Sequence, residues 1–221
     1  MSASAPRPSA EVVQRLARER VVAVLRADDP ETALQAGTAL VDGGLGMLEV
    51  TFTVPAATEV IAELRQERPA AVVGAGTVVD TAEVDAAIAA GADFLVSPGS
   101  PPAILAVPEA GGPLTIPGVA SPTEYLVARD AGCEVVKLFP AATAGPRWIR
   151  QLLGPFPDAQ VVPTGGIGLD DLGTWLAAGA VAVGLGSSLC SAEDLSEARW
   201  SVLHERASRL RSALGGPVDD R

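Results

Sequence analysis

The stretch VVAVLRADDPETALQAGTALVDGGLGMLEVTF, residues 21–52, alternates two kinds of secondary-structure signal. Its two ends, 21–26 and 47–52, are short apolar runs rich in β-branched residues, as expected for strands buried on both faces. Between them, Asp29 can cap a helix that has Pro30 at its first position, and an Ala- and Leu-rich segment then ends on a pair of glycines. A strand, a helix and a strand in this order predict two parallel strands joined by a crossover helix.

The same unit repeats along the whole chain. The runs with the character of buried strands are residues 21–26, 47–52, 71–76, 93–98, 114–119, 134–139, 160–165 and 180–186. Helical patterns that end in small-residue turns separate them. Eight such units predict an α/β fold of the (β/α)8 type, a TIM barrel, in a single domain over residues 1–221. An open doubly wound sheet is the alternative, and it is disfavoured because no G-x-G-x-x-G motif follows the first strand.

The segments outside these units also carry predictions. Residues 9–20 have the pattern of an extra N-terminal helix, which could cover the bottom of the barrel, and residues 191–214 are typical of one long final helix. The ends of the chain, 1–9 and 215–221, are expected to be loose tails.

Composition excludes several classes of function. The net charge of −11 argues against nucleic acid or an anionic membrane as a partner, since the arginines are scattered and form no basic patch in the sequence. Two cysteines and one histidine are too few for a disulfide framework or a histidine-based metal site, so we expect no metal and no cofactor. The N-terminus lacks a signal-peptide core, and no apolar run is long enough to span a bilayer, which predicts a soluble, cytoplasmic protein.

Lys137 is the only lysine of the chain, and it lies within a run of apolar strand formers. Burial of an ammonium ion costs several kcal/mol, so such surroundings favour the neutral amine, which is the nucleophile that forms a Schiff base with a ketone. Glu49 is likewise flanked by apolar residues and could move protons on and off the reacting groups. The alternative for both residues is a purely structural ion pair inside the barrel.

Polar residues and glycines also occur where predicted strands end, and the C-terminal ends of the strands form the active-site face of a parallel barrel. The side chains concerned are Arg26, Thr51, Thr77, Ser97 and Thr164. Gly165 with Gly166, and Gly186 with Ser187, follow the last two strands, where barrels present backbone N–H groups to a phosphate. These glycines could equally be tight turns that bind no ligand.

The motifs LEVTFT, GAGTV, SPG, IPG, KLFPA, PTGGI and GLGSSL occur in an order and spacing that resemble the 2-keto-3-deoxy-6-phosphogluconate (KDPG) aldolases over roughly residues 10–205. That group includes 4-hydroxy-2-oxoglutarate (KHG) and 2-keto-3-deoxy-6-phosphogalactonate aldolases. The resemblance implies a class I aldolase that needs no metal and forms a homotrimer, with Lys137 as the Schiff-base lysine and Glu49 as the general acid and base. It further implies substrate contacts from Arg26, Thr51, Thr77, Pro98, Phe139 and Thr164, and phosphate binding by Gly165, Gly166, Gly186 and Ser187.

The expected reaction is cleavage of the KDPG sugar phosphate to pyruvate and glyceraldehyde 3-phosphate, and also of 4-hydroxy-2-oxoglutarate to pyruvate and glyoxylate. One position departs from the pattern of the gluconate-type members, which often have an arginine for the substrate carboxylate where this chain has Thr53. Arg26 resembles an arginine of the galactonate-type members and could supply the missing charge, so a phosphogalactonate aldolase stays open. A phosphate-binding barrel isomerase or synthase that uses the lysine without an imine is the further alternative.

Overall fold

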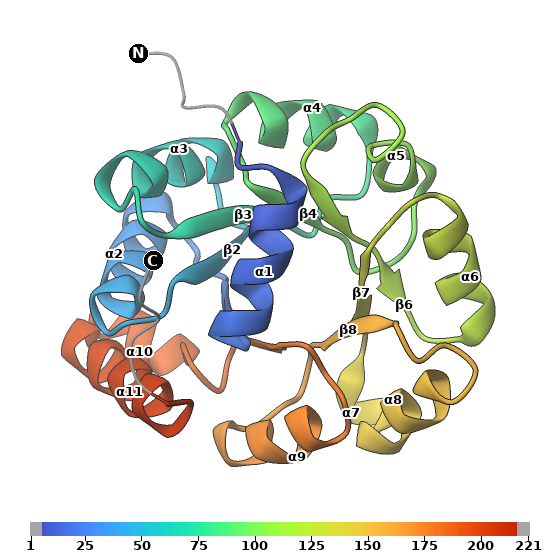
Figure 1. The fold of residues 1–221 in the computed structure, drawn as a ribbon. Helices are drawn as coiled ribbons and strands as arrows, with labels where there is room; N and C mark the ends of the chain where they lie inside the picture. The colour runs from blue at the N-terminus through green and yellow to red at the C-terminus, as the bar shows by residue number, and fades with distance from the viewer. Residues whose placement is uncertain (1–5, 216–221) are drawn as a thin grey trace.

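The computed structural model describes residues 6–215, and residues 1–5 and 216–221 lie outside the described part. A ring of helices surrounds a barrel of parallel strands (Figure 1). The strands are β1 (Val21–Leu25), β2 (Met47–Thr51), β3 (Val72–Gly76), β4 (Phe94–Val96), β5 (Leu114–Ile116), β6 (Gly118–Val119), β7 (Val135–Leu138), β8 (Gln160–Pro163) and β9 (Val183–Leu185). All eight predicted strand segments are thereby confirmed, with β5 and β6 together forming the fifth.

The helices alternate with these strands. They are α1 (Ser9–Glu19), α2 (Pro30–Asp42), α3 (Ala57–Glu67), α4 (Thr81–Ala89), α5 (Pro102–Leu105), α6 (Pro122–Asp130), α7 (Ala141–Ala144), α8 (Pro146–Leu153), α9 (Leu172–Ala177), α10 (Ala192–Ser196) and α11 (Trp200–Ala213), with a 3₁₀ turn at Leu169–Asp171. Asp29 caps α2 as predicted, its carboxylate accepting from the Thr32 N–H at 2.8 Å, with Pro30 in the first turn.

Hydrogen bonds close the strands into a ring. One sheet has the order β5-β4-β3-β2-β1-β9 and the other β6-β7-β8. Pro117 separates β5 from β6, yet its carbonyl accepts from the Lys137 N–H of β7 at 2.8 Å, which continues the ring. On the other side the Val181 N–H donates to the Val161 carbonyl at 3.0 Å, and Thr164 forms a parallel bridge with Gly184. The predicted (β/α)8 barrel is confirmed.

Two layers of apolar side chains form the core. One lies between the strands and the outer helices, and the other fills the barrel interior. Val12 and Leu16 of α1 belong to the interior layer, together with inward residues such as Phe94. Four residues apart, Val12 and Leu16 share one face of α1, so this helix closes the N-terminal end of the barrel as predicted (Figure 1).

Two predictions at the ends of the chain are wrong. The final helix is broken into α10 and α11, because Ala198 adopts a left-handed backbone conformation with φ of 50°. The N-terminal tail is shorter than the predicted 1–9, since α1 begins at Ser9 and Arg7 is held by the buried carboxylate of Asp93. Residues 1–5 of that tail, and 216–221 of the predicted C-terminal tail, lie outside the described residues.

Asp93 anchors the chain before α1 to the barrel. Its carboxylate accepts from the Arg7 backbone N–H at 2.9 Å, the Arg7 guanidinium at 2.6 Å, the Arg65 guanidinium at 3.0 Å and the Val73 N–H at 3.1 Å. Its side chain is fully buried. A buried carboxylate with this many donors is compensated for the water it has lost.

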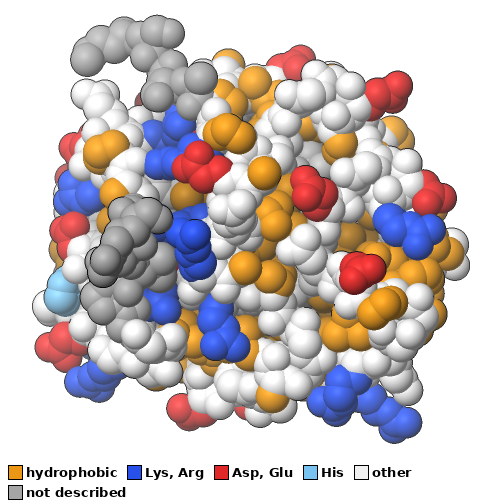
Figure 2. Space-filling model, in the orientation of Figure 1, with side chains coloured by type: hydrophobic (Ala, Val, Ile, Leu, Met, Phe, Trp, Pro, Cys, Tyr) orange, Lys and Arg blue, Asp and Glu red, His pale blue; other side chains and the backbone are white. Residues whose placement is uncertain are grey.

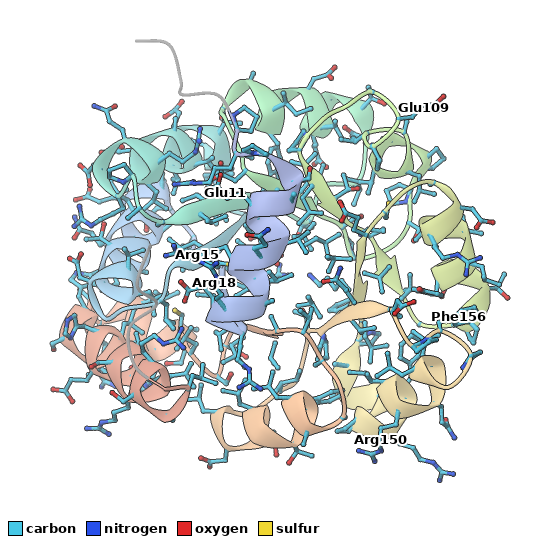
Figure 3. The ribbon with its side chains drawn as sticks, in the orientation of Figure 1. Glu11, Arg15, Arg18, Glu109, Arg150 and Phe156 are labelled. Carbon is cyan, nitrogen blue, oxygen red and sulfur yellow. The ribbon has the colours of Figure 1, made fainter. Side chains whose placement is uncertain are left out.

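A second buried carboxylate, that of Glu19 at the end of α1, joins α1 to α11. It accepts from Arg15 at 2.8 Å and from Arg211 of α11 at 2.9 Å. Basic side chains accordingly gather around α1 on this face (Figure 2), and Arg15 and Arg18 extend from that helix (Figure 3). In the described part of the chain, no helix combines the length and apolar character needed to cross a bilayer.

Candidate active site

Strand periodicity places Lys137 and Glu49 inside the barrel. On β7, Val135 belongs to the interior layer while Val136 and Leu138 face the helices, so Lys137 points inward with Val135. The same alternation on β2 turns Glu49 inward. The Lys137 Nζ lies 3.5 Å from the Glu49 Oε1, with exposed fractions of 4% and 3% for the two side chains. The predicted pair therefore meets in a buried position.

This pair has few other partners. Among residues 6–215, the Glu49 carboxylate is the hydrogen-bond partner of the Lys137 ammonium, and the Phe139 ring centroid lies 5.4 Å from the Nζ. A distance of 3.5 Å is long for a charge-assisted hydrogen bond, whose usual range is about 2.7–2.9 Å. Both groups are thus buried without the saturating contacts found around Asp93, which leaves them available to a ligand.

Glycines of β3 make the space that Glu49 occupies. A Cβ at Gly76 would collide with the Glu49 carboxylate, and a Cβ at Gly74 would lie 2.6 Å from the Phe94 ring. Gly74 and Gly76 lie two and four positions after Val72, which faces the barrel interior, so both glycines face the interior as well. Gly74 and Gly76 are not among the site residues predicted from the sequence, although two glycines at alternate positions of a strand are a signal of close approach by a neighbouring group.

Arg26 and the two threonines after Glu49 form a connected polar group at the ends of β1 and β2. The Thr51 hydroxyl donates to the Leu25 carbonyl at 2.9 Å and lies 2.7 Å from the Thr53 hydroxyl. The Arg26 Nη1 donates to the Thr53 Oγ1 at 3.5 Å. Thr51 is buried, whereas Arg26 and Thr53 are exposed to solvent.

Three further predicted substrate contacts come from other strand ends. Thr77 follows β3 in a left-handed backbone conformation with φ of 60°, and Pro98 follows β4; both are half-buried. The Phe139 ring follows β7 and covers the turn after β8, where a Cβ at Gly165 would lie 3.0 Å from that ring. Phe139 therefore contacts both the lysine side and the glycine-rich side of the site.

The two predicted phosphate loops are neighbours in space. Thr164 is buried at the end of β8 and bridges Gly184 of β9, where any Cβ would collide with the Thr164 side chain. Gly165 and Gly166 follow with φ of 97° and 72°, which favour glycine. Gly186 and Ser187 then follow β9, so the backbone after both strands is brought to one end of the barrel, as predicted.

A cavity of about 420 Å³ lies between the ends of β1 and β2 and the turn after β9, and its lining does not include Lys137 or Glu49. Its lining includes Arg26, Thr53, Gly186 and Ser187. Cys190 also lines it, but burial raises the pKa of this thiol to about 12 despite the opposing effect of Arg206, so the thiol stays protonated.

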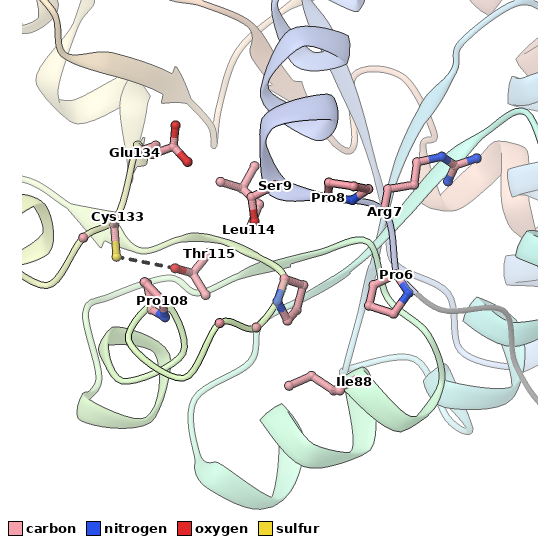
Figure 4. A pocket seen from close by; sticks show the side chains of 14 residues that line it. Pro6, Arg7, Pro8, Ser9, Ile88, Pro108, Leu114, Thr115, Cys133 and Glu134 are labelled. Atoms are coloured by element: carbon pink, nitrogen blue, oxygen red, sulfur yellow. Dashed lines mark hydrogen bonds between the residues drawn. The ribbon is translucent and has the colours of Figure 1, made fainter.

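A cavity of about 580 Å³ opens at the opposite end, near the starts of β5 and β7 (Figure 4). Among its lining residues, the Thr115 hydroxyl lies 3.4 Å from the Cys133 thiol, and burial raises the pKa of that thiol. It contains no predicted site residue. Within the described residues, no three His, Cys, Asp or Glu side chains gather as a metal site would require.

Residues 12–205 match the family model for KDPG and KHG aldolase. The 2-dehydro-3-deoxy-phosphogluconate aldolase of Treponema pallidum (strain Nichols) is 38% identical over 205 residues, which cover 92% of this chain and 98% of the relative. The KHG/KDPG aldolase of Escherichia coli (strain K12) is 37% identical over 177 residues, 79% of this chain and 83% of the relative.

A solved structure has the same architecture. The KDPG aldolase from Legionella pneumophila, with pyruvate captured at low pH as a covalent carbinolamine intermediate, superposes with a TM-score of 0.83 at 33% identity. The match covers 92% of this chain and 98% of that one.

Proposed function

The chain belongs to the KDPG and KHG aldolase family of class I aldolases, and on that premise we propose that it cleaves 2-keto-3-deoxy-6-phosphogluconate to pyruvate and glyceraldehyde 3-phosphate. The single observation that carries the proposal is the buried Lys137–Glu49 pair at 3.5 Å. A lysine and a carboxylate are the two groups that imine chemistry requires, since one attacks the ketone and the other transfers protons.

The first step prepares the two groups. The Lys137 ammonium passes a proton to the Glu49 carboxylate, which yields a neutral amine and a carboxylic acid in a buried site where charge separation is costly. The Lys137 Nζ then attacks C2 of the keto acid to form a carbinolamine. Glu49 donates its proton to the departing hydroxyl, water leaves, and the nitrogen carries the positive charge of an iminium ion.

Carbon–carbon cleavage follows from that charge. The Glu49 carboxylate removes the proton of the C4 hydroxyl, the C3–C4 bond breaks, and its electron pair moves into the iminium to give an enamine. Glyceraldehyde 3-phosphate leaves with the new carbonyl at C4. Protonation of C3 restores the iminium, and attack of water at C2 releases pyruvate and the free lysine.

We assign substrate binding to residues at the C-terminal end of the barrel, with the carboxylate bound near the end of β1 and the phosphate bound near the ends of β8 and β9. The guanidinium of Arg26 faces the cavity beside Thr53 and has the charge to hold the substrate carboxylate. The N–H groups of Gly165, Gly166, Gly186 and Ser187 would hold the phosphate, because glycine lets the backbone approach an anion closely. Thr51, Thr77, Pro98, Phe139 and Thr164 complete the proposed walls.

The experiment is a steady-state assay of pyruvate release from the phosphogluconate, phosphogalactonate and 4-hydroxy-2-oxoglutarate substrates. We expect the highest kcat/KM for the phosphogluconate substrate, measurable turnover of 4-hydroxy-2-oxoglutarate, and no loss of rate with EDTA. A higher kcat/KM for either other substrate would overturn the substrate assignment. Absence of pyruvate from all three would overturn the function.

We also propose that the enzyme is a homotrimer, as its resemblance to the family implies. Multi-angle light scattering should then give three times the chain mass of 22.4 kDa. A mass of one or two chains would contradict the trimer, but it would leave the proposed reaction unaffected.

A further inference from the structure

The polar group at the ends of β1 and β2 has a fixed direction of hydrogen bonding. The Leu25 carbonyl can only accept, so the single hydroxyl hydrogen of Thr51 points to it across 2.9 Å. The Thr53 hydroxyl, 2.7 Å from Thr51, must then be the donor to the Thr51 oxygen. This leaves lone pairs on the Thr53 oxygen, and the Arg26 Nη1 donates to it from 3.5 Å.

These bonds form a closed loop, because Arg26 follows Leu25 directly in the chain. The loop starts at a backbone carbonyl of β1, crosses to β2 through Thr51, and returns through Thr53 to the guanidinium. Its base is rigid, since Leu25 and Thr51 are both buried. Arg26 is exposed, and among the described residues its side chain has this one hydrogen-bond partner.

We propose that Thr53 is a positioning residue, whose hydroxyl fixes the Arg26 guanidinium toward the carboxylate of the bound keto acid. This inference rests on the proposed function of the same site. An unrestrained arginine loses side-chain freedom when it binds an anion, and a neighbouring acceptor that selects its orientation beforehand reduces that loss. Thr53 needs no contact with the substrate for this effect.

Thr53→Val removes the hydroxyl while preserving shape, and Thr53→Ser keeps the hydroxyl. The bond is long and exposed, so we expect Thr53→Val to raise KM by about threefold to tenfold, the range of one modest hydrogen bond, with kcat within about twofold of wild type. Thr53→Ser should restore a KM near that of wild type. Thr174→Val, an exposed threonine of α9 away from the site, is the matched control and should change neither constant.

A double-mutant cycle with Arg26→Ala separates positioning from a general structural effect. Arg26→Ala alone should raise KM by about tenfold to a hundredfold, as expected for a lost charged hydrogen bond. In that background Thr53→Val should add no further change, because the group it orients is absent. An equal effect of Thr53→Val in both backgrounds would overturn the proposal, as would a wild-type KM in the single variant or a failure of Thr53→Ser to restore it.

The proposed function is tested separately within the same set of variants. Trapping of a pyruvate adduct with borohydride should succeed in wild type and in both Thr53 variants. Absence of the adduct in wild type would refute the imine mechanism. Normal trapping, combined with an equal effect of Thr53→Val on KM in the wild-type and Arg26→Ala backgrounds, would refute only the role of Thr53.

Discussion

Both ends of the barrel bury charged pairs, and they differ in how completely the carboxylates are hydrogen-bonded. At the N-terminal end, Asp93 accepts from Arg7, Arg65 and the Val73 N–H at distances of 2.6–3.1 Å. At the C-terminal end, Glu49 faces Lys137 across 3.5 Å. A saturated carboxylate holds elements together, whereas a sparsely partnered pair keeps donors and acceptors free for a substrate. The two ends should therefore respond to mutation in opposite ways.

The largest expected effect is on activity at the C-terminal end. Lys137→Arg keeps a positive charge beside Glu49, but a guanidinium is not a free amine at any working pH. Cleavage should fall by more than about a thousandfold, since loss of a covalent nucleophile removes the main route of catalysis. Circular dichroism should show a folded protein. Substantial activity in this variant would refute the imine mechanism.

Substitution of Glu49, the partner of Lys137, should lower the rate of cleavage by a smaller factor than Lys137→Arg. Glu49→Gln keeps the shape of the side chain but cannot take up or release protons, so kcat should fall by about 10²- to 10⁴-fold. Thermal unfolding should be little affected, because Gln fills the same space and the hydrogen bond of this carboxylate to Lys137 is a long one. A kcat equal to that of wild type would show that another group or a water transfers the protons.

A substitution at the N-terminal end of the barrel should lower the stability of the protein and leave the catalytic rate unchanged. Asp93→Asn removes the buried charge that pairs with the Arg7 and Arg65 guanidinium groups, and breaking such a buried pair costs about 3–5 kcal/mol. Urea unfolding should show this loss, while kcat measured on the folded fraction stays near wild type. A large drop in kcat with unchanged stability would mean that the two ends are not separated as described.

The smallest effect is expected at the two cysteines, one at each end. Burial raises the pKa of Cys133 and raises that of Cys190 to about 12, and thiol reagents attack the thiolate. At pH 8, well below that pKa, both thiols stay protonated in the folded enzyme. Ellman's reagent should therefore leave native activity intact and label both cysteines only after unfolding. Rapid native labelling with loss of activity would contradict the burial of the Cys190 thiol.

Most of the fold was predictable from the sequence, because the spacing of apolar residues and the length of each apolar run identify buried strands locally. Each of the eight predicted strand segments corresponds to a strand, with ends that shift by a few residues. The inward direction of Lys137 and Glu49 was also predictable, since an isolated charged residue in a buried strand has a barrel interior as one of its few destinations. Asp29 and Pro30 marked the start of α2 for a similarly local reason.

What the sequence did not reveal depends on contacts between distant residues. The hydrogen bonds between Asp93 and Arg7 join residues that are 86 positions apart, and no local sequence pattern predicts them. The break at Ala198 sits within a continuous helical pattern, and an alanine there gives no stop signal. The hydrogen-bond loop through Thr53 appears only when β1 and β2 lie side by side, so the sequence showed only that an arginine was missing at that position.

Reductive trapping can identify the imine-forming residue without ambiguity, because Lys137 is the only lysine in the chain. The enzyme is incubated with pyruvate, reduced with borohydride, and digested for peptide mapping by mass spectrometry. We expect a reduced pyruvate adduct on the peptide that contains Lys137, and much slower formation of that adduct in Glu49→Gln. An unmodified Lys137 peptide after saturating pyruvate and borohydride would contradict the imine mechanism.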